Sequence, residues 1–211
     1  ITVSQTSVTT TTGTAVNLNN AVGTYTLTSV ITNGAANGIL LDSLGSSAVT
    51  VTGGSIVNAS TRGIDINSGT GNFSYGGTIT TTSAGRSVEI TNRTGGTVAF
   101  TGEVTDAGLG INLATNTGTT INFSGGITVS SGANPAFAAT GGGTVNVTGT
   151  NTLATTTGTY AQTTTTTGAL ASEVLKSTIN LPPIIYKNQG GVVGVYVSKD
   201  VNFETVYALK V

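Results

Sequence analysis

The sequence contains no cysteine, histidine, methionine or tryptophan, and these absences exclude several kinds of chemistry. No disulfide can form, and nucleophilic catalysis by a Ser–His or Cys–His pair lacks its general base. A zinc site would have to be built from carboxylates alone, which is an uncommon set of ligands. We therefore expect neither a metal nor another cofactor.

Charged residues are also scarce, because 7 basic and 8 acidic residues make up only 7% of the 211-residue chain. A nucleic-acid-binding protein needs a basic surface to neutralise phosphates, so no nucleic-acid partner is expected. Gly and Thr break the longest apolar runs well short of the roughly 18 residues of a membrane span, so no transmembrane segment is expected either. No signal peptide is recognisable, since the first three residues already alternate like a strand, and the chain is interpreted as a mature or excised piece.

Threonine and glycine dominate what is present, with 45 threonines and 31 glycines. Threonine is stiff at χ1 and favours strands, whereas glycine and asparagine mark turns. The positive mean hydropathy argues against disorder, which is typical of chains with low hydrophobicity and high net charge. The composition therefore predicts an all-β protein.

An internal repeat organises most of the chain. Five copies align with a period of 23 to 26 residues, and a looser copy starts near Gly13; the five begin at Gly38, Gly63, Ser87, Gly110 and Ala136. Each copy holds three short apolar–polar alternations, which we interpret as three strands. The first inward residue of each strand should stack on its counterpart in the next copy. For the first strand these residues are Ile39, Ile64, Val88, Ile111 and Phe137; for the second, Val49, Phe73, Val98, Ile121 and Val145; and for the third, Ile56, Ile79, Val104, Ile127 and Leu153.

Strands with one apolar face cannot bury that face alone, but stacked copies bury it continuously. The repeat thus predicts a parallel, three-faced β-solenoid of about six coils over residues 13–160, preceded by an N-terminal cap strand at 1–12. A β-sandwich is the main alternative, but it would use Asn-Gly or Asp-Gly hairpins. Only Asn33-Gly34 and Asn37-Gly38 are of that type.

The segments GINLATNTGTTINFSGG and GGTVNVTGTNTLATTTGT resemble the Gly/Thr/Asn-rich right-handed β-helix repeats of secreted bacterial surface proteins. Autotransporter passengers and filamentous adhesins are the usual hosts of such repeats. The resemblance covers about 70% of the chain, from Gly13 to Thr159. It implies an extracellular or cell-surface location and a structural or adhesive role, with surface glycans as candidate partners.

The composition changes after residue 160, and residues 161–211 are interpreted as a linker followed by a small antiparallel β meander. One face of its last strand is apolar, through Val201, Phe203, Tyr207, Leu209 and Val211. Two hypotheses fit this segment. In the first it caps the open end of its own solenoid. In the second it donates its last strand to the sheet edge of a second copy and so builds a homopolymer.

The best candidate for chemistry is a pair of carboxylates. Asp65 and Glu89 fall in the same outward column on neighbouring coils, where their side chains are expected about 5 Å apart. Four more charged residues lie close to this column: Asp42, Arg62, Arg86 and Arg93. The pair could serve a carbohydrate-active enzyme as in a retaining glycosidase, or form a surface salt-bridge network. No aromatic platform for a sugar accompanies it, so we expect a non-enzymatic protein.

Two further patterns in the sequence bear on function. A flat threonine array would indicate ice binding, but the outward column through Thr50 continues as Ser74, Ala99, Asn122 and Asn146. Five Asn-x-Ser/Thr triplets would accept N-linked glycans in a glycosylating organism; they begin at Asn58, Asn72, Asn92, Asn122 and Asn146.

Overall fold

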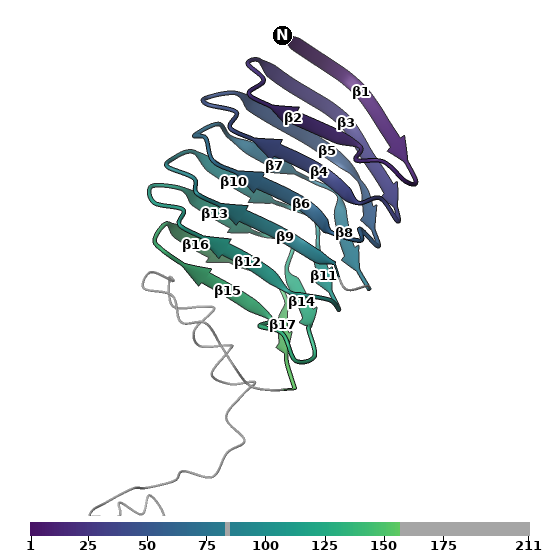
Figure 1. Ribbon diagram of the computed structural model, residues 1–211, viewed down its shortest axis with the longest axis vertical. Coiled ribbons are helices and arrows are strands. Elements are labelled where there is room, and N and C mark those ends of the chain that lie inside the picture. Colours follow the sequence, from purple (N-terminus) through teal and green to yellow (C-terminus); the bar gives the residue numbers. More distant parts are fainter. Residues whose placement is uncertain (83–84, 157–211) are drawn as a thin grey trace, which may run out of the picture. The chain divides into compact units, whose positions relative to one another are not determined.

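The computed structural model describes residues 1–82 and 85–156, and within these ranges its regular elements are all β-strands (Figure 1). They form a parallel β-solenoid of about six coils, as the repeat predicts. The C-terminal meander expected at 161–211 lies outside the described residues.

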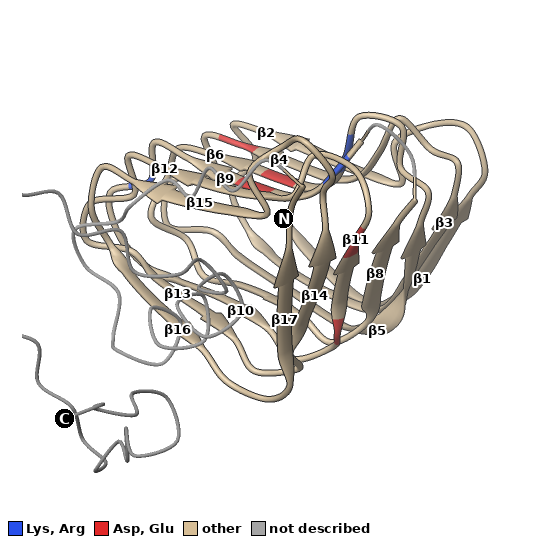
Figure 2. Ribbon diagram, turned by 90° about the horizontal axis from the view of Figure 1, so that it is seen from below, with Lys and Arg blue, Asp and Glu red and all other residues tan. Residues whose placement is uncertain are grey.

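One face of the solenoid is a six-stranded parallel sheet. Its strands, in spatial order, are β2 (Val16–Asn19), β4 (Asn37–Asp42), β6 (Arg62–Asn67), β9 (Arg86–Thr91), β12 (Ile111–Ala114) and β15 (Phe137–Thr140). Each strand comes from the next copy of the repeat, so neighbouring strands in the sheet lie one coil apart in the sequence. Of the eight charged residues in the described ranges, this six-stranded sheet carries five (Figure 2).

An eleven-stranded sheet forms the other two faces. The second face contains β7 (Phe73–Tyr75), β10 (Thr97–Phe100), β13 (Thr120–Phe123) and β16 (Thr144–Val147), and the third contains β8 (Thr78–Thr81), β11 (Val104–Asp106), β14 (Ile127–Ser130) and β17 (Asn151–Ala154). Three long strands cross both faces at the N-terminal end: β1 (Thr2–Thr10), β3 (Thr24–Asn33) and β5 (Ala48–Val57). The faces separate after β5, because β5 pairs with both β7 and β8. In Figure 2 the three faces surround the core.

The register confirms the inward columns, with one correction. Ile39 pairs with Ile64, Val49 with Phe73, and the first- and second-face columns continue in the same way. In the last coil, however, Ile127 pairs with Asn151, and Leu153 pairs with Val129. Leu153 therefore stands two residues beyond its predicted position. The last coil keeps the four-residue spacing from the second-face strand to the third, and this spacing outweighs the preference for an apolar residue.

Side chains of the same kind stack along the core. Phe100 and Phe123 are register partners on successive coils, and Phe73 pairs with Val98, two residues before Phe100. All three phenylalanines are buried. The rings of Phe73 and Phe100 have centroids 6.1 Å apart, and Phe123 reaches Phe137 of the first face at 6.0 Å. Aromatic contacts of this kind contribute beyond the area that they bury.

A left-handed residue follows each strand of the six-stranded sheet. After β15 it is Gly141, with φ at 73°. After the other five strands φ lies between 48° and 60°, at the non-glycine residues Asn20, Ser43, Ser68, Asn92 and Thr115. Each donates its backbone N–H to the carbonyl that precedes the same corner one coil further on, at 2.8–3.0 Å. The ladder of the sheet thus continues through the corner, and the chain turns into the second face.

Candidate functional site: the charged face of the six-stranded sheet

Two outward columns run side by side on the six-stranded sheet. The first places Asp65 beside Glu89, the pair singled out in the sequence, between Leu40 and Asn112. The second column is made of Asn19, Asp42, Asn67 and Thr91. Apart from Asn112, these side chains line an open depression of about 450 Å³, which described residues of β2, β4, β6 and β9 form.

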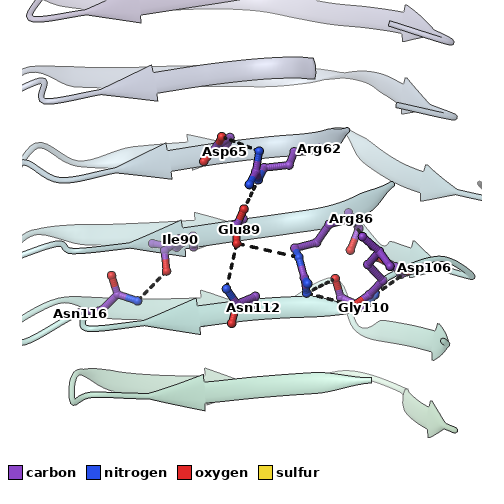
Figure 3. Close-up of polar contacts among 11 residues, drawn as sticks. Arg62, Asp65, Arg86, Glu89, Ile90, Asp106, Gly110, Asn112 and Asn116 are labelled. Atoms are coloured by element: carbon purple, nitrogen blue, oxygen red, sulfur yellow. Dashed lines mark hydrogen bonds and ion pairs between the residues drawn. The ribbon is translucent and has the colours of Figure 1, made fainter. Parts of the chain in front are cut away.

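Glu89 is held from three sides (Figure 3). The guanidinium of Arg62 on the preceding coil donates a hydrogen bond to Glu89 Oε2. Asn112 Nδ2 on the following coil donates to Oε1 at 2.9 Å, and Arg86 Nε lies 4.0 Å from the same oxygen. The carboxylate is therefore fixed between two coils, and its side chain is only 15% exposed.

Asp65 is held far less firmly. Within the described ranges its carboxylate has a single charged partner, Arg62 Nη1 at 3.6 Å, and no hydrogen bond to it is found. Burial raises the pKa of Asp65; Arg62 lowers it and the nearby Asp42 carboxylate raises it, so that the pKa lies above its usual value. A raised pKa means that the protein disfavours the charged form at this position.

Asp42 organises the second column. Its carboxylate accepts hydrogen bonds from Asn67 Nδ2 at 2.9 Å, from Ser43 Oγ at 3.0 Å and from Asn19 Nδ2 at 3.3 Å. Thr91 Oγ1 extends the ladder by donating to Asn67 Oδ1 at 3.1 Å. This column ties four coils together through side chains alone.

Asp106 is a buried carboxylate that the sequence analysis did not single out. It lies in β11 and accepts hydrogen bonds from three backbone N–H groups, of Ser87 at 2.6 Å, Gly108 at 2.7 Å and Gly110 at 3.0 Å. Arg86 lies close by and donates to the carbonyl of Gly110 at 3.2 Å (Figure 3). The signal was present in the sequence, because period-2 alternation puts Asp106 on the same inward face as Val104.

The two arginines beside these carboxylates differ from Arg93. The pKa of Arg86 lies below its usual value, chiefly because the guanidinium is buried. The Asp106 carboxylate raises this pKa, and the Arg62 charge lowers it.

Arg93 was expected near the same outward face, and this expectation is wrong, since its side chain is buried with 2% exposure. The left-handed corner at Asn92 turns the chain toward the second face, and the side chain of the residue after it is buried.

The Asn-x-Ser/Thr asparagines lie in different settings. Asn72 and Asn92 are exposed, and Asn58 is half-buried next to Thr82, whose hydroxyl donates to its side chain. Asn122 and Asn146 stack on the second face, where Asn146 Nδ2 donates to Asn122 Oδ1 at 2.8 Å. Glycosylation at any of them stays a prediction.

The threonine pattern is also more regular than the sequence suggested. The outward column through Thr50, Ser74, Ala99, Asn122 and Asn146 is as expected. On the third face, however, four threonines stack on consecutive coils: Thr80, Thr105, Thr128 and Thr152. This ladder was missed, although Thr80, Thr105 and Thr128 each follow a residue of the expected third inward column; only Thr152 required the register of the last coil.

The assembly candidates Val201, Phe203, Tyr207, Leu209 and Val211 lie outside the described residues. In the part of the chain that the structure describes, no group of three or more acidic side chains could hold a metal ion. That same part contains no helix with the length and apolar character of a membrane span.

The chain matches no model of a known protein family and no solved structure. A stretch of 44 residues is 52% identical to the type IV secretion system protein virB10 of Brucella ovis and of Brucella melitensis biotype 1. It covers 21% of this chain and 12% of those proteins. The virB10 protein of Brucella suis biovar 1 is 52% identical over the same length, which is 11% of that protein. The chain thus spans about an eighth of the length of the curated relatives it matches.

Proposed function

We propose that this chain supplies a structural and adhesive β-solenoid segment at a bacterial cell surface, as a rod or filament subunit without enzymatic activity. One observation carries the proposal: the polar side chains of the six-stranded sheet bind the neighbouring coil. Asp42 is bound by amides from the coils on both sides, and Glu89 is likewise bound from both sides. Side chains that are bonded in this way stabilise the stack of coils, and their hydrogen-bonding groups are already occupied rather than available to a substrate.

The setting of the protein is supported by the short similarity. The matching proteins are named as type IV secretion system proteins, which favours a place at the bacterial envelope for this chain too. The candidate partners are a second copy of the chain and surface glycans. Both fit a face rich in hydroxyl and amide groups.

A glycosidase is the second candidate, because the two carboxylates differ in the way that such enzymes require. Glu89 is fixed by cations, which favours the ionised form of a nucleophile, and the pKa of Asp65 is raised, which favours an acid. Against it stands the site itself. The depression is open, and its described lining contains Leu40 but no aromatic side chain to hold a sugar ring.

The decisive experiment compares the full chain with the double variant Asp65→Asn/Glu89→Gln and with Glu103→Gln, which removes an exposed carboxylate elsewhere. Each protein is incubated with a panel of polysaccharides, and the release of reducing ends and unsaturated sugars is measured. We expect no release by any of the three, and unchanged binding to immobilised glycans. Cleavage that the double variant loses and Glu103→Gln keeps would replace the structural proposal by the enzymatic one. Negative-stain microscopy of the same samples distinguishes single rods from filaments.

A further inference from the structure

The N-terminal end of the solenoid carries a sheet edge that no described strand covers. Among the described strands β1 pairs with β3 alone, so its other edge has no neighbouring strand (Figure 1). Natural proteins commonly protect such an edge with a charged side chain or a proline, and β1 contains neither. An irregularity at Gln5 interrupts its register, but from Ser7 to Thr10 the pairing with β3 is regular. This part of the edge can therefore accept another strand.

Apolar side chains gather at the same end. Within the described ranges three large ones are exposed, namely Ile1 by 79%, Val22 by 77% and Ile31 by 41%. Ile31 is the register partner of Thr9, so it lies one strand in from the open edge. Five further apolar residues pack on the core but are only partly buried; they are Val3, Val8, Ala15, Leu18 and Ala21. A partner that covers this end would thus remove apolar surface from water.

This end of the solenoid has no charged side chain. Asp42 is the first charged residue of the sequence, so the segment that forms β1, β2 and β3 contains none. Such a surface gives a charged partner nothing to pair with, whereas two copies of it can meet without repulsion between like charges. Opposite residues of an antiparallel pair exchange N–H···O=C bonds, so a strand edge is complementary to its own copy across a two-fold axis. The partner that fits is a second copy of the same edge.

We propose that two copies of the chain join head to head by antiparallel pairing of their β1 edges around Val8. Val8 of one copy lies opposite Val8 of the other, and Ser7 lies opposite Thr9. Opposite residues point to the same side of a sheet, so the partly buried Val8 stays on the core side and the exposed Ser7 and Thr9 stay outside. This inference rests on the proposed function for the second copy as partner, and it names the surface by which the copies meet.

Charges placed on the edge test this pairing. In a pair of identical copies, Ser7→Lys/Thr9→Lys puts like charges opposite each other, and so does Ser7→Glu/Thr9→Glu. In sedimentation velocity the full chain should have twice the 20.8 kDa mass of one chain. Each double variant alone should sediment as a single copy, and an equal mixture of the two should regain the pair. Thr50→Lys/Thr52→Lys, at exposed positions of β5, is the matched control and should keep the pair.

Every other outcome counts against the proposal. A full chain that sediments as a single copy would overturn it, and so would double variants that still pair or a mixture that does not. Circular dichroism checks that each double variant keeps its strands, and Thr9→Lys mixed with Thr9→Glu repeats the test if one of them does not fold.

Deletion of Val201–Val211 separates the two possible occupants of the edge. The shortened chain should keep the pair, because β1 is intact. Loss of the pair would identify the C-terminal strand as the occupant and overturn this inference, while a second copy would remain the partner. Cleavage of a polysaccharide would instead overturn the proposed function and leave the pair unaffected, so the two failures are distinguishable.

Discussion

The rings of Phe100 and Phe123 stack face to face, with centroids 4.8 Å apart and planes inclined by 10°. The centroid distance equals the spacing of neighbouring strands in a sheet, so the ring of Phe123 lies directly on the ring of Phe100 one coil before. The two residues are register partners in β10 and β13 and are nearly inaccessible to solvent. The coil repeat of the backbone and the packing repeat of the core are therefore the same repeat.

Phe123→Asp tests this core. The variant would bury an unpaired charge between Phe100 and the next coil, and we expect it to lower the free energy of unfolding by about 4 kcal/mol or more. Chemical denaturation followed by circular dichroism measures the change. Ser124→Asp, at the exposed neighbouring position, is the control and should change stability little. Wild-type stability in Phe123→Asp would show that the inward columns are assigned wrongly.

Asp65→Asn tests the acidity of the charged face. The folded-state pKa of Asp65 is raised above its unfolded value, so its contribution is favourable at low pH and is lost as the pH rises through the folded-state pKa. At neutral pH the variant should therefore be as stable as the wild-type chain or more stable, and its advantage should vanish in acid. Denaturation midpoints measured across the acidic range, with Glu103→Gln as the control, check this. A variant that is less stable at neutral pH would mean that the attraction of Arg62 outweighs the cost of burial.

Asp106→Asn tests the buried carboxylate. Its two oxygens accept three backbone N–H groups, one on Oδ2 and two on Oδ1. An amide has a single acceptor oxygen and would turn its NH₂ group toward one of these donors. We expect a loss of about 1–3 kcal/mol in unfolding free energy, because a buried donor is left unsatisfied. Hydrogen exchange at Ser87, Gly108 and Gly110 should accelerate in the variant; unchanged protection there would contradict the assignment.

Thr115→Gly tests the left-handed corner. Thr115 is β-branched and exposed, yet it holds φ at 57°, a conformation that costs an L-residue roughly 1–2 kcal/mol. Glycine adopts this conformation freely, so the variant should be more stable by about 1 kcal/mol after its own entropy cost. Thr105→Gly, in the middle of β11, is the matched control and should be less stable than the wild-type chain. Thermal unfolding of both variants decides, and destabilisation of both would refute the role of the corner.

Deletion of Val201–Val211 tests the two readings of the C-terminal segment. If this strand joins a neighbouring copy, the shortened chain should be a soluble monomer with an intact solenoid, whereas the full chain should form larger assemblies. Light scattering and circular dichroism measure both properties. A full chain that is itself monomeric, combined with loss of the fold on deletion, would identify the segment as an intramolecular cap.

The sequence alone determined the architecture, because each requirement of the solenoid is local. Apolar residues two apart, such as Ile64 and Ile66, mark a strand with one buried face, and the repetition of three such strands requires coils to stack. The pairing of Asp65 with Glu89 followed from the same alignment, since residues at equal positions in consecutive copies become neighbours in the sheet.

Only the tertiary structure decided what happens where alternation is interrupted. The position of Leu153 depends on the length of the turn before it, and the burial of Arg93 depends on the left-handed residue that precedes it. Alternation predicts direction along a strand but is lost at a corner, where one residue with positive φ redirects the chain. The tertiary structure likewise decided that Glu89 is clamped by three partners while Asp65 has one, because hydrogen bonding depends on the side chains of both neighbouring coils.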